Sequence, residues 1–418
     1  MIKLSTNVVL LFLLLFTTQN ADAEDLSYWS YEGLGQYQAQ KVIVNGGNIY
    51  TCTDSGFFKK SLLSADTIWT SLGFEGKYIW SFLIISSDTM LIGIDPTSYG
   101  ADTISIFKSV NGGMDWQPFQ NGFGGELYTG RAACDFGCAP HQSDTLFVAN
   151  HNSGIGRSLD GGLSWVPVFG DWGDKSNMYD VAVNPYYPNK VYTGTFGVGH
   201  ICFFYISSDY GITWDPYLTG GLFLGMTYEF DPLDSNHFYF NQAGLRETFD
   251  GGWTFNSVPE PIPCRSFVIH PDSSNIFYVT HYSHGGALRY FKSYDTCNSW
   301  VADSNPDMIT HEVYDLTIAV LEDRTILAFG THDGVYFHTD IESWSCGDAN
   351  FDRNINVSDA VYIINYVFVS GNAPMPYESG NVNCDASVNI SDAVYIINYV
   401  FSGGNDPCDT DGDDIPDC

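Results

Sequence analysis

The chain has 418 residues, with 49 acidic side chains against 16 basic ones and a formal net charge of −33. So large an excess of acid repels nucleic acid and anionic membrane surfaces, and it favours cation binding or an extracellular location. Aromatic residues make up 16% of the chain and glycine occurs 42 times. We therefore expect a folded protein that is rich in β-structure and turns.

The first 23 residues have the pattern of a secretory signal peptide. Lys3 precedes an apolar run from Val8 to Phe16, and the small-residue segment Ala21-Asp22-Ala23 fits a cleavage site. The apolar run is short for a bilayer span, and no later segment has the composition of one. The pattern predicts a secreted, extracellular or surface-associated protein without membrane insertion, and an uncleaved anchor is the alternative. Ten cysteines in an exported chain predict disulfides or buried free thiols.

An aromatic residue at the start of an expected strand recurs at intervals of about 45 residues, a period typical of repeat architectures. Seven such units match the four-stranded blades of a β-propeller, which we place at residues 28–345. The series is Trp69, Trp116, Trp165, Trp214, Phe255, Trp300 and Trp344.

Two further repeated features set the register of the strands. A turn of the form S-x-D-x-G-x-x-W is complete at Ser158 to Trp165, and it is degraded in other units, as where Cys297 replaces the second glycine. An X-Pro dipeptide follows a short apolar strand in four units, where proline ends one strand and begins a turn. The expected blade is strand, X-Pro turn, strand, glycine-rich link, strand, S-x-D-x-G turn and strand. The X-Pro turns are Ala139-Pro140, Asn184-Pro185, Asp231-Pro232 and His270-Pro271.

This region resembles the Asp-box (BNR-repeat) propellers, a group that includes sialidases, xyloglucanases, sortilin-type receptors and the photosystem II assembly factor. The resemblance implies that the boxes lie on the outer rim, away from the pore face that binds ligands. Every box residue is then expected to be structural. Because one fold carries many functions, the resemblance does not decide what this propeller does.

Two catalytic alternatives concern the pore face. Sialidase chemistry would need three arginines around a carboxylate and a Tyr/Glu pair, and only Arg131 and Arg265 begin a blade on that side. Xyloglucanase-like hydrolysis needs two carboxylates across a cleft. Asp180 and Asp315 begin the first strands of blades four and seven and are the candidates. In xyloglucanases the cleft lies between two propellers, and this chain has room for one, so catalysis is the minor hypothesis.

After residue 345 the chain contains a duplication. Eleven residues that begin at Ser358 recur without change from Ser391. Each copy follows a loop whose side-chain oxygens have the spacing of Ca²⁺ ligands, and its apolar residues then follow helical spacing. Three carboxylates against two predict tighter binding in the first loop. The predicted ligands are Asp348, Asn350, Asp352, Asn354, Asn356 and Asp359, then Asn381, Asn383, Asp385, Ser387, Asn389 and Asp392.

The paired loop–helix segment, residues 346–405, resembles a type I dockerin. The resemblance implies two Ca²⁺ ions and Ca²⁺-dependent docking onto a cohesin-like or other cell-surface protein. It also implies that positions 10 and 11 of each loop contact that partner, here Val357-Ser358 and Ile390-Ser391. The alternative is a terminal cap that Ca²⁺ stabilises and that has no partner.

The last residues, 406–418, look like one thrombospondin type 3 repeat, in which alternating carboxylates share Ca²⁺. A Cys408–Cys418 bridge would favour this third site over a solvated acidic end. Its ligands would be Asp409, Asp411, Asp413 and Asp417.

These features predict a mainly β protein, a seven-bladed β-propeller with a small C-terminal α-helical Ca²⁺-binding domain. We expect a secreted binding or scaffold protein whose propeller face takes a glycan or a protein, in a setting of polysaccharide breakdown. The alternative function is a glycoside hydrolase acting on O-glycosyl bonds of a polysaccharide. No cofactor other than Ca²⁺ is expected.

Overall fold

The structure is a computed structural model of the whole chain. It describes residues 28–64, 66–95, 105–119, 121, 133–140, 142–150, 154–170, 178–196, 202–218, 227–241, 244–260, 264–281, 290–302, 312–321, 324–341, 345–350, 354–369, 371, 373–374, 377–385 and 387–408.

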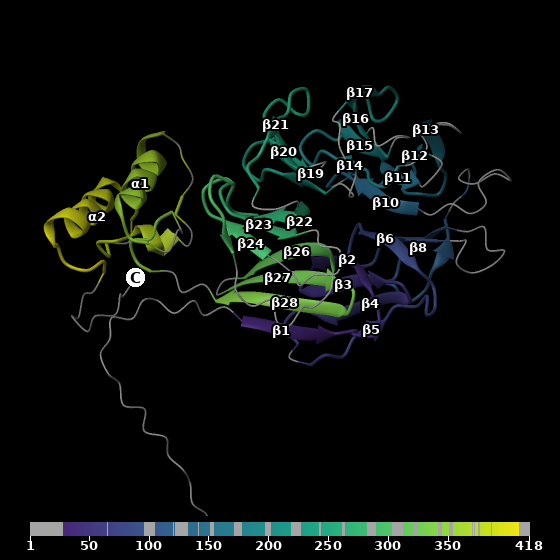
Figure 1. Cartoon of the computed structure of the whole chain (residues 1–418), viewed down its shortest axis with the longest axis horizontal. Coiled ribbons are helices and arrows are strands. Elements are labelled where there is room, and N and C mark those ends of the chain that lie inside the picture. Colours follow the sequence, from purple (N-terminus) through teal and green to yellow (C-terminus); the bar gives the residue numbers. More distant parts are fainter. Residues whose placement is uncertain are drawn as a thin grey trace, which may run out of the picture.

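Seven four-stranded antiparallel sheets follow one another along the chain and form a β-propeller (Figure 1), as the repeats predict. Blades one and two consist of β2 (Ala39–Asn45), β3 (Asn48–Thr53), β4 (Gly56–Ser61) and β5 (Thr70–Ser71), then β6 (Ile79–Ile84), β7 (Met90–Ile94), β8 (Ile106–Ser109) and β9 (Gln117–Pro118). Blades three and four consist of β10 (Ala133–Cys138), β11 (Leu146–Asn150), β12 (Gly154–Ser158) and β13 (Val166–Phe169), then β14 (Ala182–Val183), β15 (Val191–Phe196), β16 (Cys202–Ser207) and β17 (Asp215–Leu218). Blades five and six consist of β18 (Tyr228–Phe230), β19 (Phe238–Asn241), β20 (Leu245–Thr248) and β21 (Asn256–Ser257), then β22 (Cys264–Ile269), β23 (Phe277–His281), β24 (Tyr290–Ser293) and β25 (Val301–Ala302). Blade seven consists of β26 (Val313–Leu321), β27 (Arg324–Thr331), β28 (Gly334–Ile341) and β1 (Tyr28–Gly33).

Blade three shows why the sequence folds in this order. Its second strand, β11, is an apolar run that is buried along its whole length, because neighbouring blades cover both faces of the sheet. The Ala139-Pro140 turn separates β10 from β11, and the box separates β12 from β13. Apolar side chains of blades two and three, such as Leu91 and Phe136, share one core cluster with Trp165. The core of the propeller therefore lies between blades.

The box at Ser158 to Trp165 is a self-contained hydrogen-bonded turn. The Ser158 hydroxyl accepts a hydrogen bond from the Gly162 amide at 2.7 Å and donates one to Asp160 Oδ1 at 2.8 Å. Asp160 Oδ1 also accepts from the Ser164 amide at 2.8 Å. These contacts hold Gly162 at φ 91°, a conformation that glycine adopts without a Cβ clash. In the sixth box Cys297 takes this position at φ 64°, so the degraded box keeps its backbone shape.

The indoles of Trp116 and Trp165, each of which follows a box, join neighbouring blades. The Trp165 indole Nε1 donates to the Phe119 carbonyl at 2.9 Å, and Phe119 follows the last strand of blade two. Trp116 donates in the same way to the Leu72 carbonyl of blade one, at 2.8 Å. This buried donor satisfies a carbonyl at the edge of the preceding blade, so the tryptophans stabilise the ring of blades.

The ring closes through the N-terminal strand, which corrects one sequence-based prediction. The repeats place Trp344 at the start of the outermost strand of the last blade, but β1 occupies that position. β1 pairs antiparallel with β28, with Trp29 opposite His338. Trp344 itself lies outside the described residues. The last blade thus combines strands from both ends of the propeller, which makes its closure a long-range contact.

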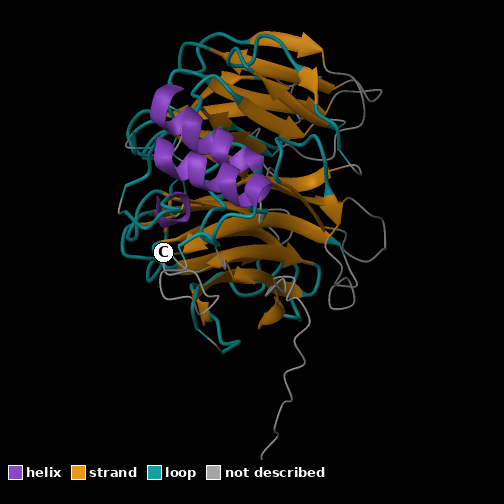
Figure 2. Ribbon diagram, turned by 90° about the vertical axis from the view of Figure 1, so that its left-hand side faces the viewer, coloured by secondary structure: helices purple, strands orange, loops and turns teal. Residues whose placement is uncertain are grey.

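The C-terminal segment contains two short α-helices, α1 (Val357–Val369) and α2 (Ile390–Ser402), with a 3₁₀ turn at Tyr377–Gly380 between them. The helices lie side by side (Figure 2). Ala360 and Ile363 of α1 are buried, as are their copies Ala393 and Ile396 of α2, and together they form the core of this unit. The duplicated sequence therefore builds one small core from two copies of the same face.

One disulfide of this unit differs from the pairing considered above. Cys408 is bonded to Cys384, which lies in the second loop, and not to Cys418. Cys418 and residues 409–417 lie outside the described part of the chain, so the four acidic residues of the third predicted Ca²⁺ site do too. The observed bridge fixes the segment after α2 to the second loop. Among the described residues, none of the helices is long and apolar enough to span a bilayer.

Candidate functional site

The innermost strands of the blades carry β-bulges at corresponding places. The register shifts between Ala39 and Lys41 in blade one and between Ile79 and Ser81 in blade two. Blades three, six and seven have a shift at the same place in their first strands. A bulge turns an extra side chain out of the alternating pattern, and bulges are frequent next to functional sites.

The bulges surround a pocket of about 380 Å³ at the start of the inner strands, to which all seven blades contribute. Its volume lies within the range of about 300–1,000 Å³ that is typical of small-molecule sites. Both sequence candidates, Asp180 and Asp315, line it. The remaining lining residues are Gln40, Lys41, Trp80, Ser81, Cys134, Asp135, Tyr179, Val181, Ala182, Thr227, Tyr228, Arg265 and Tyr314.

Asp180 is a buried carboxylate with two different oxygen environments. Its Oδ1 accepts hydrogen bonds from the Gly194 amide at 3.1 Å and from the Tyr228 hydroxyl at 2.8 Å. Its Oδ2 is buried and has no hydrogen-bond partner. Burial raises the pKa of Asp180 well above the usual value, and the hydrogen bond from Tyr228 opposes this only in part. Asp180 therefore holds blades four and five together, and its raised pKa favours the protonated form.

Asp315, the second predicted carboxylate of the pocket, lies on β26 of blade seven. Its Oδ2 accepts from the Val42 amide of blade one at 3.0 Å, and its Oδ1 accepts from the Ser266 hydroxyl of blade six at 3.3 Å. Burial raises its pKa to about 6, against the hydrogen bond from Val42 and the charge of Lys41. Asp315 thus joins blades one, six and seven.

Lys41, Ser81 and Asp135 form a closed polar cluster between these two carboxylates. Lys41 Nζ donates to Asp135 Oδ1 at 2.8 Å and to the Ser81 hydroxyl at 3.1 Å. The Ser81 hydroxyl donates in turn to Asp135 Oδ1 at 2.9 Å. Burial lowers the pKa of Lys41, but the charge and hydrogen bond of Asp135 and the charge of Asp315 together outweigh it, and the net shift is upward. Because Lys41 stays protonated, it cannot act as a base that would activate Ser81 as a nucleophile.

The two arginines considered for a carboxylate clamp do not both appear at the pocket. Arg265 lines it and lies over the Tyr314 ring, 5.9 Å from the ring centroid. Arg131 lies outside the described residues. The aromatic residues Trp80, Tyr179 and Tyr314 add apolar area to an otherwise polar wall.

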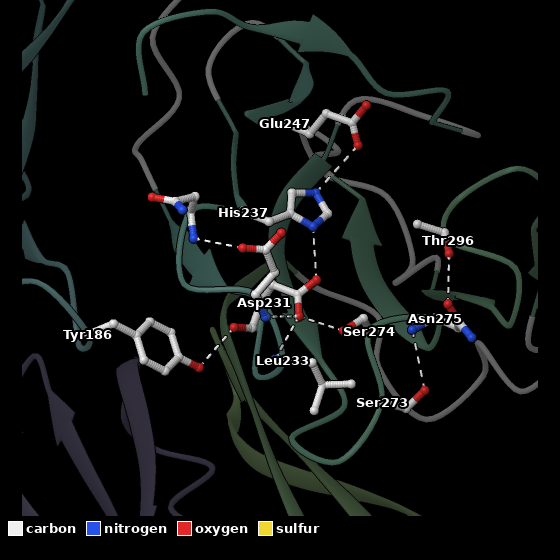
Figure 3. A network of polar contacts seen from close by, with 11 residues as sticks. Tyr186, Asp231, Leu233, His237, Glu247, Ser273, Ser274, Asn275 and Thr296 are labelled. Carbon is white, nitrogen blue, oxygen red and sulfur yellow. Dashed lines mark hydrogen bonds and ion pairs between the residues drawn. The ribbon is translucent and has the colours of Figure 1, made fainter. Parts of the chain in front are cut away.

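A second polar network lies at the Asp231-Pro232 turn, away from this pocket (Figure 3). His237 Nδ1 is 2.9 Å from Asp231 Oδ2, and the Ser274 hydroxyl donates to Asp231 Oδ1. The group contains serine, histidine and aspartate, but serine and histidine both contact the carboxylate and not each other. A nucleophile needs its base within hydrogen-bond reach. The network instead ties the turn of blade five to blade six.

The two C-terminal loops share one hydrogen-bond scaffold. In the first loop Asp359 Oδ1 accepts from the Asn350 amide at 3.1 Å, and Oδ2 accepts from the Asn356 amide at 2.8 Å. In the second loop Asp392 makes the same two contacts, with Asn383 at 3.2 Å and Asn389 at 2.8 Å. The contact with Asn389 also completes a helix capping box at α2, so it stabilises the helix in its own right.

One atom of the second loop is left without a partner. Asn381 Oδ1, at position 1, is buried and accepts no hydrogen bond. An oxygen at this position is a ligand type that Ca²⁺ uses, so the residues of the second loop fit the ion. Asp348 and Asp359, at positions 1 and 12 of the first loop, are also buried.

The structure describes all but one of the Ca²⁺ ligands that were predicted in the two loops. Asp352 lies outside the described residues, while the other loop positions of the prediction are described. Within the described ranges, no group of three or more His, Cys, Asp or Glu side chains is arranged to hold a metal ion.

The four residues predicted to contact a partner fall into two kinds. Val357 and Ile390 are exposed, at 46% and 43% of their surface. The Ser358 hydroxyl accepts from Asn350 Nδ2 at 2.8 Å, and the Ser391 hydroxyl accepts from Asn383 Nδ2 at 2.7 Å. The serines are thus part of the loops, whereas the apolar residues face solvent.

Sequence reasoning missed Lys41, Ser81 and Asp135, although one signal was available. Asp135, Asp180 and Thr227 each stand five residues before the proline of their X-Pro turn, and all three line the pocket. Alignment of the repeats on that proline would have grouped them. Lys41 and Ser81 belong to blades without an X-Pro turn in the series, so this alignment does not reach them.

The raised pKa of Asp315 predicts a pH-dependent effect of Asp315→Asn. The folded state keeps this proton up to about pH 6, whereas the unfolded chain loses it near pH 4, so the stabilisation is complete at low pH and is lost as the pH rises through 6. Asparagine avoids the cost of a buried charge. We expect Asp315→Asn to raise the free energy of unfolding by up to about 3 kcal/mol at pH 7.5. At pH 4 it should change little, and urea unfolding at both pH values measures this. An equal effect at both would contradict the prediction.

Comparison with known proteins defines the fold only. No family model and no curated protein matches the sequence. Among solved structures, a GH74 xyloglucanase from Xanthomonas campestris matches with a TM-score of 0.59 and 15% identity, over 77% of this chain and 55% of that chain. An ancestral GH74 enzyme matches with a TM-score of 0.51 and 14% identity, over 62% and 36%. YCF48 from Cyanidioschyzon merolae matches with a TM-score of 0.49 and 11% identity, over 74% and 98%. This chain spans about half the length of the xyloglucanase.

Proposed function

We propose that the chain is a secreted, non-catalytic binding protein. Its propeller binds a glycan at the pocket of the inner strands, and its C-terminal unit is a dockerin-like module that binds Ca²⁺ and attaches the propeller to a cohesin-like or other protein at a cell surface. The observation that carries this proposal is the hydrogen bonding of the two pocket carboxylates. Asp180 and Asp315 each accept a backbone N–H from a neighbouring segment, so both have a structural role.

The chemistry of the pocket supports binding over hydrolysis. A glycosidase needs one carboxyl as acid and a second, ionised carboxylate across the scissile bond. In this pocket the Asp135 carboxylate is paired with Lys41 at 2.8 Å, which opposes its use as nucleophile or base. Aromatic rings beside hydroxyl and amide groups suit a sugar, which has apolar C–H faces and polar edges.

The duplicated loops support the second part of the proposal. Asn381 Oδ1 lacks a partner, and both loops arrange a buried aspartate against the same two backbone amides. When bound, Ca²⁺ would supply positive charge to Asp348, Asp359 and Asp392. The exposed Val357 and Ile390 offer the apolar contact that a docking partner needs.

A glycoside hydrolase is the second candidate, because one observation favours it. Burial raises the pKa of Asp180, which favours the protonated state that a general acid needs, and Asp180 lines the pocket together with Asp315. The solved xyloglucanases share the fold with this chain, but at 15% identity their activity does not transfer.

The two candidates predict opposite results for Asp180→Asn. Asparagine keeps an oxygen for the Gly194 amide and the Tyr228 hydroxyl, but it has no proton to give. In a binding protein, glycan binding on an array is retained and neither the wild type nor the variant releases reducing ends. In a hydrolase, the wild type releases reducing ends and the variant is about 10²–10⁴-fold slower. Release of reducing ends that depends on Asp180 would replace the first proposal with the second.

A further inference from the structure

The unpartnered oxygen of Asp180 is the feature of the propeller that most needs explanation. The residue is only 3% exposed, and Oδ1 already has two donors while Oδ2 has none. A buried polar atom without a partner costs about 1–3 kcal/mol, so such atoms normally have a partner from protein, water or ligand. Asp180 lines the pocket, and the space beside it is therefore where a partner would come from.

The other charged groups of the pocket already contact groups of the protein itself. Lys41 is paired with Asp135, and the Asp315 carboxylate receives the Val42 amide and the Ser266 hydroxyl. Arg265 lies over the Tyr314 ring. A charged ligand would lose its hydration here and would have to compete with these contacts for a counter-charge, which is costly. An uncharged ligand with several hydroxyl groups does not meet this penalty.

The shape of the pocket restricts how a chain of sugars can enter. All seven blades contribute to its wall, so among the described residues a ring of strand starts bounds it. Its volume of about 380 Å³ lies at the lower end of the range for small-molecule sites. A polysaccharide can place its end in such a ring, whereas an internal segment would need an exit.

We propose that this pocket recognises the uncharged terminal residue of a glycan chain, with Asp180 Oδ2 in a hydrogen bond to one of its hydroxyl groups. This inference rests on the proposed glycan-binding function and adds to it both the part of the glycan that is bound and the residue that binds it. A carboxyl oxygen can donate this hydrogen bond when it is protonated and accept it when it is not, so the unpartnered Oδ2 suits a hydroxyl group in either state.

The test uses the full chain on an array of neutral gluco-, xylo-, galacto- and manno-oligosaccharides of two to six units, attached through their reducing ends. A second set carries a terminal glucuronic acid at the free end. We expect the wild type to bind at least one neutral oligosaccharide and to bind its acidic counterpart at least tenfold more weakly. This comparison needs no variant, so it does not depend on the folding of one.

Three variants then assign the contact. Asp180→Val should weaken binding at least tenfold, and Asp180→Asn, which restores a donor at the same place, should return it to within about threefold of the wild type. Asp160→Ala on the outer rim, which is not part of the pocket, serves as the matched control and should bind as the wild type does. Thermal melts establish that each variant is folded.

The outcomes separate the two levels of the proposal. Binding that is equally strong with the acidic end, or that a folded Asp180→Val variant retains, overturns recognition of the terminal residue but leaves glycan binding intact. The absence of binding to every oligosaccharide and polysaccharide tested overturns the proposed function, and this inference with it.

Discussion

Replacement of Glu32 with alanine is expected to lower the free energy of unfolding by about 3–5 kcal/mol, which is the range for breaking a buried ion pair by removing one partner. Glu32 lies on β1, and its carboxylate contacts Lys60 Nζ on β4 of blade one. The two residues are 8% and 3% exposed, so the variant leaves the Lys60 ammonium buried without its counter-charge. Urea unfolding of the full chain measures the change.

Two further variants show whether the effect comes from the unpaired charge. The double variant Glu32→Leu with Lys60→Met replaces the pair with apolar side chains and should recover most of the lost free energy. Asp340→Ala should act as Glu32→Ala does, because Asp340 on β28 holds the equally buried Lys292 of blade six at 2.6 Å. A loss below about 1 kcal/mol for Glu32→Ala would mean that the pair does not stabilise the closure.

Removal of Ca²⁺ is expected to have a comparably large effect on the C-terminal unit. Ligand at 100 to 1,000 times its dissociation constant stabilises the folded state by about 2.7 to 4.1 kcal/mol. The core of this unit consists of few residues, chiefly Ala360, Ile363, Ala393 and Ile396, so we expect the helices to lose much of their order in EDTA. Circular dichroism should show a loss of helical signal in EDTA that Ca²⁺ restores and an equal concentration of Mg²⁺ does not.

Calorimetry on the full chain should detect at least two Ca²⁺ sites, and Asp359→Ala should abolish the tighter one. Asp359→Asn is the matched control. It keeps an oxygen for the backbone amides that Asp359 now holds, but removes the charge. If charge governs affinity, both variants lose the site. Heat that does not differ from dilution into buffer would contradict the Ca²⁺ prediction.

The blades could be predicted because each unit repeats local signals. The box turn is formed by contacts within seven residues, from Ser158 to Ser164, so its sequence carries its structure. Even Cys297 was placed correctly, because its neighbours Ser293 and Asp295 keep the hydrogen bonds of the box. Local contacts of this kind leave a pattern that can be read along the chain.

The closure and the disulfide could not be predicted in this way. β1 pairs with β28 across about 300 residues, and nothing in the sequence near Trp344 excludes a strand of its own there. Cys384 and Cys408 are brought together by packing of the second loop against the segment after α2. In both cases the partner is chosen by tertiary packing, which a local motif does not report.

The candidate site was predicted in part, for a related reason. Asp180 and Asp315 were found because acidic residues at strand starts are visible in the sequence. The charge state of the pocket was not predictable, because it depends on a contact between Lys41, which follows the bulge of blade one, and Asp135 of blade three. A contact between distant blades has no local signature.

The closure of blade seven also has a mechanical consequence. Any tension applied through the C-terminal unit enters the propeller at the end of β28. This strand is paired along its length on both sides, with β1 and with β27. A pull along the strand must shear many hydrogen bonds at once, whereas an edge strand could be peeled away one pair at a time. Because forced unfolding is governed by the unfolding rate, an anchored propeller would resist flow or dragging forces best at the point where its tether is attached.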